Sequence, residues 1–137
     1  MYVLTVASFL MVVASSSAAD ELSWLQGSWQ SDRARTLEAN PQVQNLPSET
    51  QIRFASMFGS TIWKIDGRQV SISHPEFGET LSDTYTVHPM GADRFQLDIG
   101  KEDGTFLLIR TDFGFCTEWQ SDEATSWIVE CFGRKND

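Results

Sequence analysis

The chain has 137 residues, among them five Trp and nine Phe, and it carries a formal net charge of −9 at pH 7. That length suits one domain with a hydrophobic core, and so many aromatic residues exclude an intrinsically disordered chain. The surplus of acidic residues argues against binding to nucleic acid or to anionic lipid, because both need clustered Lys and Arg.

Residues 1–19 contain no charged side chain, whereas the rest of the chain is rich in them. An apolar run over residues 3–14 is followed by Ser17 and Ala19, small residues at the spacing that signal peptidase recognises. The run is shorter than the roughly 20 apolar residues that cross a bilayer, which favours a signal peptide over a membrane anchor. We therefore expect residues 20–137 to be one exported domain, periplasmic or secreted.

A short strand over residues 25–30 is expected first, and signals for a helix follow at once. Ser31 is a favourable N-cap for a helix over residues 32–38, because its hydroxyl can accept a backbone hydrogen bond in the first turn. Pro41 lies beyond this stretch, and proline does not continue a helix. The sequence thus predicts a first short helix after the first strand.

A second helix is expected between Ser48 and Gly59. Ser48 and Gln51 have the spacing of a capping box, in which each side chain satisfies a backbone N–H group of the other. Phe54 and Phe58 then share one helix face, and glycine suits the left-handed position that closes a helix. The same residues also alternate as a strand would, but the cap and the glycine favour the helix.

From Ser60 onward, apolar and polar residues alternate, which is typical of strands that bury one face. Turn residues such as Asp66-Gly67 separate these stretches and favour tight hairpins. No internal repeat interrupts the pattern, so we expect one continuous meander. The strands expected after the helices cover residues 61–65, 70–74, 81–87, 95–99, 105–110, 115–120 and 126–132.

The two cysteines are expected to form a structural disulfide, because an exported protein folds in an oxidising compartment. If residues 122–125 form the loop of the last hairpin, Cys116 falls directly opposite Cys131. Directly opposed residues of antiparallel strands bring their Cβ atoms close enough to bridge. The alternative is two free thiols, which would require a reducing compartment.

Eight antiparallel strands in hairpin order, each with one apolar face, predict an all-β fold. Closure into an up-and-down barrel removes both exposed edges of the sheet. A two-layer sandwich would satisfy the alternation almost as well. The two short helices between the first and second strands favour the barrel, because they are placed where they could cover an open end.

Three short motifs resemble those of the lipocalins. Residues 25–29 (Leu-Gln-Gly-Ser-Trp) resemble the Gly-x-Trp signature of the first lipocalin strand, and Thr111-Asp112-Phe113 is similar to a Thr-Asp-Tyr signature. Arg134 stands where lipocalins carry an Arg that packs over the signature Trp. The chain looks most like the small lipocalin-like proteins that Gram-negative bacteria export. Gly27 would then permit a close backbone approach at one barrel end, and Arg134 would stack on Trp29, which plugs that end.

The resemblance implies binding of a small apolar molecule inside the barrel, beneath the helices. Any of Arg53, Lys64 and Arg110 that pointed inward would anchor a ligand carboxylate. A packed core without ligand is an equal alternative, because an eight-stranded barrel is just wide enough to be filled by its own side chains. The residues expected to line the cavity are Phe54, Phe58, Trp63, Ile65, Tyr85, Phe95, Leu97 and Phe106.

A second hypothesis is a secreted protease-inhibitor-like or envelope interaction barrel with a packed core. An enzyme is not expected, because the chain lacks the common nucleophile, zinc-protease and phosphate-loop motifs. His74 and His88 are expected on different strands, and the acidic stretch over residues 98–104 is read as a solvated hairpin turn, so we expect no metal site. We further expect no cofactor and a monomer.

Overall fold

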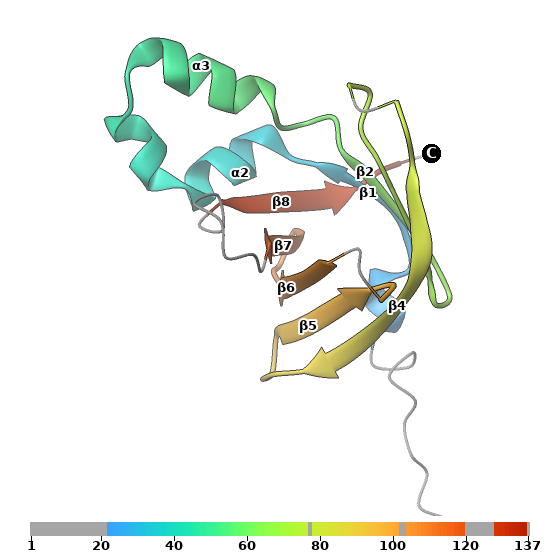
Figure 1. Ribbon diagram of the computed structural model, residues 1–137. Coiled ribbons are helices and arrows are strands. Elements are labelled where there is room, and N and C mark those ends of the chain that lie inside the picture. Colours follow the sequence, from blue (N-terminus) through green and yellow to red (C-terminus); the bar gives the residue numbers. More distant parts are fainter. Residues whose placement is uncertain (1–21, 77, 102–103, 120–127, 137) are drawn as a thin grey trace, which may run out of the picture.

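The computed structural model describes residues 22–76, 78–101, 104–119 and 128–136 (Figure 1). The predicted signal peptide, residues 1–19, and the predicted loop over residues 122–125 lie outside this part of the chain. Within it, eight antiparallel strands pair in sequence order and form a closed barrel. The expected up-and-down barrel is therefore confirmed, and the alternative two-layer sandwich is wrong.

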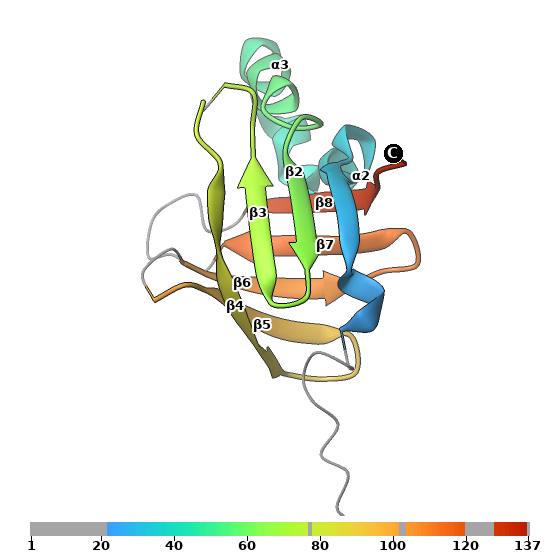
Figure 2. The ribbon, with the colours of Figure 1, turned by 90° about the vertical axis from the view of Figure 1, so that its right-hand side faces the viewer.

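The strands follow the predicted meander closely. Figure 2 shows β1, β2 and β3 side by side, with β6, β7 and β8 crossing behind them at a steep angle. Their bounds are β1 Gly27–Ser31, β2 Ile62–Asp66, β3 Gln69–Ser73, β4 Leu81–Pro89, β5 Arg94–Ile99, β6 Gly104–Arg110, β7 Gly114–Trp119 and β8 Val129–Arg134.

The segment between β1 and β2 holds the two short helices that were expected, α2 (Arg33–Ala39) and α3 (Ser48–Ser56), joined by a 3₁₀ turn, η2 (Pro41–Asn45). Helix α2 packs along β8, whereas α3 rests on η2 and projects beyond the barrel (Figures 1 and 2). A further 3₁₀ turn, η1 (Ser23–Leu25), precedes β1. No helix in the described part of the chain has both the length and the apolar character to cross a bilayer.

The start of α2 differs from the prediction. Asp32, not Ser31, is its N-cap, and the carboxylate accepts the backbone N–H of Arg35 at 3.0 Å. Ser31 is instead the last residue of β1, and its Oγ accepts the backbone N–H of Gly59 at 2.9 Å. The hydroxyl that was expected to cap a helix therefore ties the end of β1 to the chain that follows α3.

The capping box predicted for α3 is wrong. Pro47 occupies the N-cap position and has no side chain that could accept a hydrogen bond, so Ser48 becomes the first helical residue. The Gln51 amide turns back and donates to the carbonyls of Gln44 at 3.1 Å and Leu46 at 2.8 Å. Gln51 thus fastens α3 to η2 rather than closing its own first turn.

One end of the barrel, here called the closed end, is covered by η1. Strand β1 begins at Gly27 and not at Leu25, because Leu25 belongs to η1 and is fully buried. The Trp29 indole donates to the Leu25 carbonyl at 2.7 Å, and the Arg134 guanidinium lies 4.1 Å above the Trp29 ring. Arg134 also donates to the carbonyls of Trp24 and Gln26. The stack expected between Arg134 and Trp29 is present.

Gly27 has a φ of +114°, and a Cβ atom there would come within 2.6 Å of Arg134 Nη1. The close approach expected at this glycine is therefore an approach of the Arg134 side chain. Thr111, in the other signature, accepts the backbone N–H of Gly114 at 3.1 Å in the turn from β6 to β7, where its neighbour Asp112 is exposed.

Candidate functional site

Aromatic side chains fill the centre of the barrel. The Trp63 ring lies 5.4 Å from Phe106, 5.7 Å from Phe115 and 5.4 Å from Phe132, measured between ring centroids. Phe115 also contacts Trp29 with a centroid distance of 5.0 Å. Rings at these distances pack as they do in protein cores. Between Trp63 and η1, the space inside the barrel is therefore occupied by side chains of the chain itself.

Six of the eight residues expected to line a cavity belong to this barrel core: Trp63, Ile65, Tyr85, Phe95, Leu97 and Phe106. The other two, Phe54 and Phe58, form a separate cluster with Val43, outside the barrel core. Their rings lie 4.8 Å apart and pack with Leu37, Leu46 and Ile128. The structure thus divides the predicted set between the barrel and a small core inside the helical segment.

None of the three cations considered as an inward anchor lies in the barrel interior. Arg53 and Lys64 are exposed, on α3 and on the outer face of β2. Arg110 is also exposed and lies 4.8 Å above the Trp24 ring at the closed end. The structure therefore offers no support for a ligand carboxylate held by one of these side chains.

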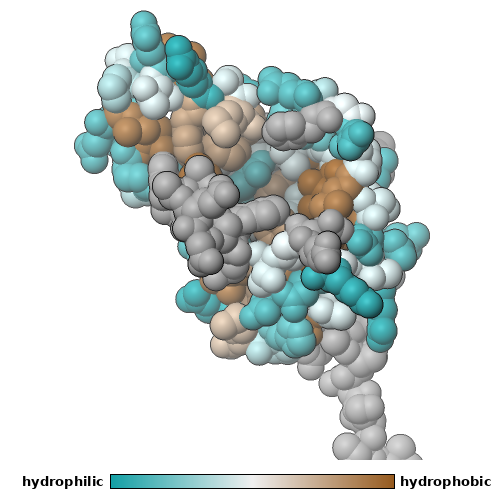
Figure 3. Space-filling view, in the orientation of Figure 1, coloured by the Kyte–Doolittle hydropathy of each residue, from teal (hydrophilic) through white to brown (hydrophobic). Residues whose placement is uncertain are grey.

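Polar side chains gather inside the opposite end of the barrel, here called the mouth, where β1 ends and β2 and β8 begin. Each of these polar residues lies two positions along the chain from an aromatic residue of the barrel core; they are Ser31, Thr61, Thr117 and Glu130. Because alternate residues of a strand share a face, these side chains point toward the barrel interior. Figure 3 shows the surface hollowed between the helical segment and the strands.

Glu130 is the unusual member of this group. Its Oε1 atom is shielded from solvent and has no hydrogen-bond partner among the described residues. Burial raises the pKa of the Glu130 carboxyl, while hydrogen bonds from the hydroxyls of Ser31 and Thr61 to this carboxyl, and the charge of His74, lower the pKa to a smaller extent. The net direction is upward, so the environment inside the mouth disfavours the ionised carboxylate.

Trp24 Nε1 also lacks a hydrogen-bond partner within the described part of the chain, but it lies at the closed end beneath Arg110. An indole N–H is neutral, whereas a carboxyl group can ionise, so a missing partner is more costly at Glu130. Beneath Glu130, the floor of the mouth is apolar and consists of Trp63, Phe106 and Phe132. The mouth therefore combines an aromatic surface with an acceptor, Glu130 Oε1, that has no partner among the residues the structure describes.

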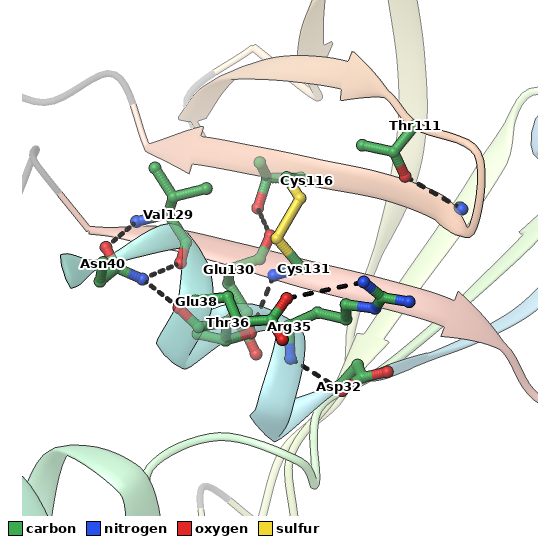
Figure 4. The surroundings of a disulfide bond; sticks show 12 residues. Asp32, Arg35, Thr36, Glu38, Asn40, Thr111, Cys116, Val129, Glu130 and Cys131 are labelled. Atoms are coloured by element: carbon green, nitrogen blue, oxygen red, sulfur yellow. Dashed lines mark hydrogen bonds and ion pairs between the residues drawn. A yellow bond between two sulfur atoms is a disulfide. The ribbon is translucent and has the colours of Figure 1, made fainter.

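The position of Glu130 is fixed by the helix that covers β8 (Figure 4). On one side of it, the Asn40 side chain accepts the backbone N–H of Val129 at 3.0 Å and donates to the Val129 carbonyl at 2.7 Å. On the other side, Thr36 Oγ1 accepts the N–H of Cys131 at 3.0 Å. Thr36 and Asn40 are both 0% exposed.

The predicted disulfide, Cys116–Cys131, is present and joins β7 to β8 on the outer face. Both backbone polar groups of Cys131 turn away from β7, toward Thr36 and Asp32. The two cysteines therefore form a non-hydrogen-bonded pair, in which side chains approach most closely. Together with the α2 contacts, the disulfide holds β8 along both edges.

The two histidines do not form a joint site. His74 Nδ1 accepts the backbone N–H of Glu76 at 3.1 Å near the mouth. His88 lies on the outer face of β4, 3.2 Å from Asp98, whose pKa is lowered mainly by a hydrogen bond from Thr105. No group of three or more side chains suited to a metal ion gathers among the residues that the structure describes.

Sequence reasoning did not single out Glu130, although a signal was present. Alternate residues place Ile128, Glu130 and Phe132 on one face of the chain and Cys131 on the opposite face. The predicted pairing of Cys131 with Cys116 then indicates which face points inward. A charged residue on the apolar face of that strand marks the mouth.

Scans against protein-family models, curated proteins and solved structures find no match to this chain.

Proposed function

We propose that this protein is an exported, lipocalin-like barrel that binds a small molecule in its mouth. The observation that carries the proposal is the buried Oε1 atom of Glu130, which has no hydrogen-bond partner among the described residues. Leaving such an acceptor unpaired costs roughly 1–3 kcal/mol. A hydrogen-bond donor on a bound ligand would satisfy it.

The packing inside the barrel limits the size of this ligand. Because Trp29, Phe115 and Phe132 fill the closed half, a ligand would have to bind between the mouth and the aromatic floor. Its apolar part would contact Trp63 and Phe106, which agrees with the small, largely apolar ligand implied by the lipocalin resemblance. Export is supported by the apolar run over residues 3–14 and is compatible with the disulfide.

A second candidate is a protease-inhibitor-like or envelope interaction barrel that binds no ligand. The packed rings favour it, since Phe115 and Phe132 are stacked with centroids 5.0 Å apart at the centre of the barrel. The polar mouth argues against it, because a barrel that served only as a scaffold would gain stability from an apolar residue in place of Glu130.

Tryptophan fluorescence separates the two candidates, because Trp63 lies at the floor of the mouth and Trp24 at the closed end. The full chain, exported by a host cell and purified without denaturation, is first examined by native mass spectrometry for a bound small molecule. It is then titrated with a panel of small apolar molecules that carry one hydrogen-bond donor. We expect saturable quenching that Trp63→Phe abolishes and Trp24→Phe preserves.

The ligand-binding proposal is contradicted if no panel member changes the fluorescence of the wild-type protein and no small molecule is found in the native spectrum. It is also contradicted if Trp63→Phe and Trp24→Phe reduce the quenching equally, because the ligand would then bind outside the mouth. Circular dichroism of both variants checks that the barrel is intact.

A further inference from the structure

We propose that the ligand of the mouth is an organic cation, and that its ammonium group binds the carboxylate of Glu130. This inference rests on the proposed function and names the chemical class of the ligand. It follows from the side chains around Oε1, from the apolar floor beneath them and from the charge of the whole chain.

The chemistry of the acceptor atom, Glu130 Oε1, limits the class of ligand. Oε1 can accept a hydrogen bond, and both a neutral hydroxyl and an ammonium group can donate one. The carboxyl is also desolvated, which penalises its charge. A neutral donor would leave that charge uncompensated, whereas an ammonium group supplies the opposite charge and a stronger, charge-assisted hydrogen bond.

The neighbouring groups agree with this assignment. The hydroxyls of Ser31 and Thr61 donate hydrogen bonds to the carboxyl, and their oxygen lone pairs can accept the remaining N–H groups of an ammonium. The aromatic floor suits the hydrocarbon part of an amine, and aromatic ring faces attract cations. The electrostatic effect of His74 on Glu130 is smaller than the effect of burial.

An organic cation fits better than a metal ion. A metal ion needs several ligating side chains, and groups of three or more are not found among the residues that the structure describes. The formal net charge of −9 attracts cations toward the protein over distances longer than direct contact. Both observations favour a small organic amine as the occupant.

The test compares two probes of nearly equal shape, 2-phenylethylamine and 2-phenylethanol, by isothermal titration calorimetry at neutral pH. We expect the wild-type chain to bind the amine at least tenfold more tightly than the alcohol. Glu130→Gln keeps the side-chain shape and removes the charge, so it should weaken amine binding at least tenfold and change alcohol binding less than twofold. Glu118→Gln, on the outer face of β7, is the matched control and should change neither.

The outcomes separate this inference from the proposed function. If the wild-type chain binds both probes equally and Glu130→Gln has no effect, the mouth binds small molecules but the ligand is not a cation. If neither probe binds at millimolar concentration, and the wider panel also fails, the proposed function itself is wrong. If Glu118→Gln weakens amine binding as much as Glu130→Gln does, general surface charge explains the binding and the inference fails.

Discussion

Thr36 Oγ1 accepts the backbone N–H of Cys131 at 3.0 Å, so a side chain of α2 takes the place of a strand partner. Strand β1 pairs with β8 from Arg134 to Phe132 and then ends. Beyond that point the missing hydrogen bonds come from Thr36 of α2 and from the two residues that cap this helix, Asp32 and Asn40. The helix thus pairs the part of β8 that extends beyond its contact with β1.

Replacing the Thr36 hydroxyl should therefore destabilise the protein although the side-chain volume is kept. Thr36→Val leaves the buried N–H of Cys131 without an acceptor, and we expect a loss of about 1–3 kcal/mol in the free energy of unfolding. Urea denaturation measures it. The control is Thr86→Val on β4, where the side chain is exposed, with an expected change below about 0.5 kcal/mol. Equal effects of the two variants would contradict the role given to α2.

Reduction of the disulfide should destabilise the barrel. Cys116 and Cys131 are 15 residues apart in the sequence, and a loop of that length corresponds to about 3 kcal/mol in the chain-entropy estimate. Denaturation with and without reductant measures the loss. The double variant Cys116→Ser with Cys131→Ser should be insensitive to reductant. An intact mass that does not increase by two hydrogen atoms on reduction would show that the cysteines are not paired.

Gly27 should be intolerant of a side chain. Gly27→Ala places a Cβ atom against the Arg134 guanidinium at a φ of +114°, so Arg134 must give up its position over Trp29. We expect a loss of more than about 1 kcal/mol. Gly91→Ala is the matched control, because its nearest neighbour would be 3.9 Å away and its φ is not positive. A Gly27→Ala variant as stable as Gly91→Ala would contradict this account of the closed end.

Much of this fold could be predicted from the sequence because strands and hairpins leave local signals. Alternation locates the strands, and the spacing of Cys116 and Cys131 about the last hairpin predicts their pairing, which the structure confirms. Helix caps were predicted less well. Ser31 and Ser48 have the right chemistry for an N-cap, but the neighbouring residues Asp32 and Pro47 occupy those positions.

The long-range polar contacts could not be predicted from the sequence. Thr36 of α2 and its C-cap residue Asn40 lie four residues apart on the same side of the helix, where polar residues would normally indicate a solvent-exposed face. Only the docking of α2 on β8 shows that this face is buried. The partner of Thr36 in β8 is Cys131, which lies 95 residues later in the sequence. The inward orientation of Glu130 could have been predicted, because strand alternation alone puts this residue on the inner face.

The stability of the protein should depend on pH through Glu130. Burial raises its pKa above the usual 4.5 in the folded state, so folding favours the protonated carboxyl. This contribution is complete below pH 4.5 and is lost as the pH rises through the higher pKa of the folded state. Glu130→Gln should therefore stabilise the protein at neutral pH, and the gain should shrink toward zero in acid. Thermal unfolding of the wild-type chain and of Glu130→Gln, at neutral pH and in acid, measures this gain in stability. A gain that is equal or larger in acid would contradict the prediction.

A small cation is expected to bind inside the mouth of the barrel. An NMR titration of the ¹⁵N-labelled chain with 2-phenylethylamine tests it most directly, because each backbone amide reports separately. We expect saturable shifts for Ser31, Thr61, Thr117 and Glu130, and little change for Gln26 and Gly67 at the closed end. Shifts confined to the groove between α2 and α3, lined by Leu37, Val43 and Ile52, or no saturable shift at any amide, would contradict it.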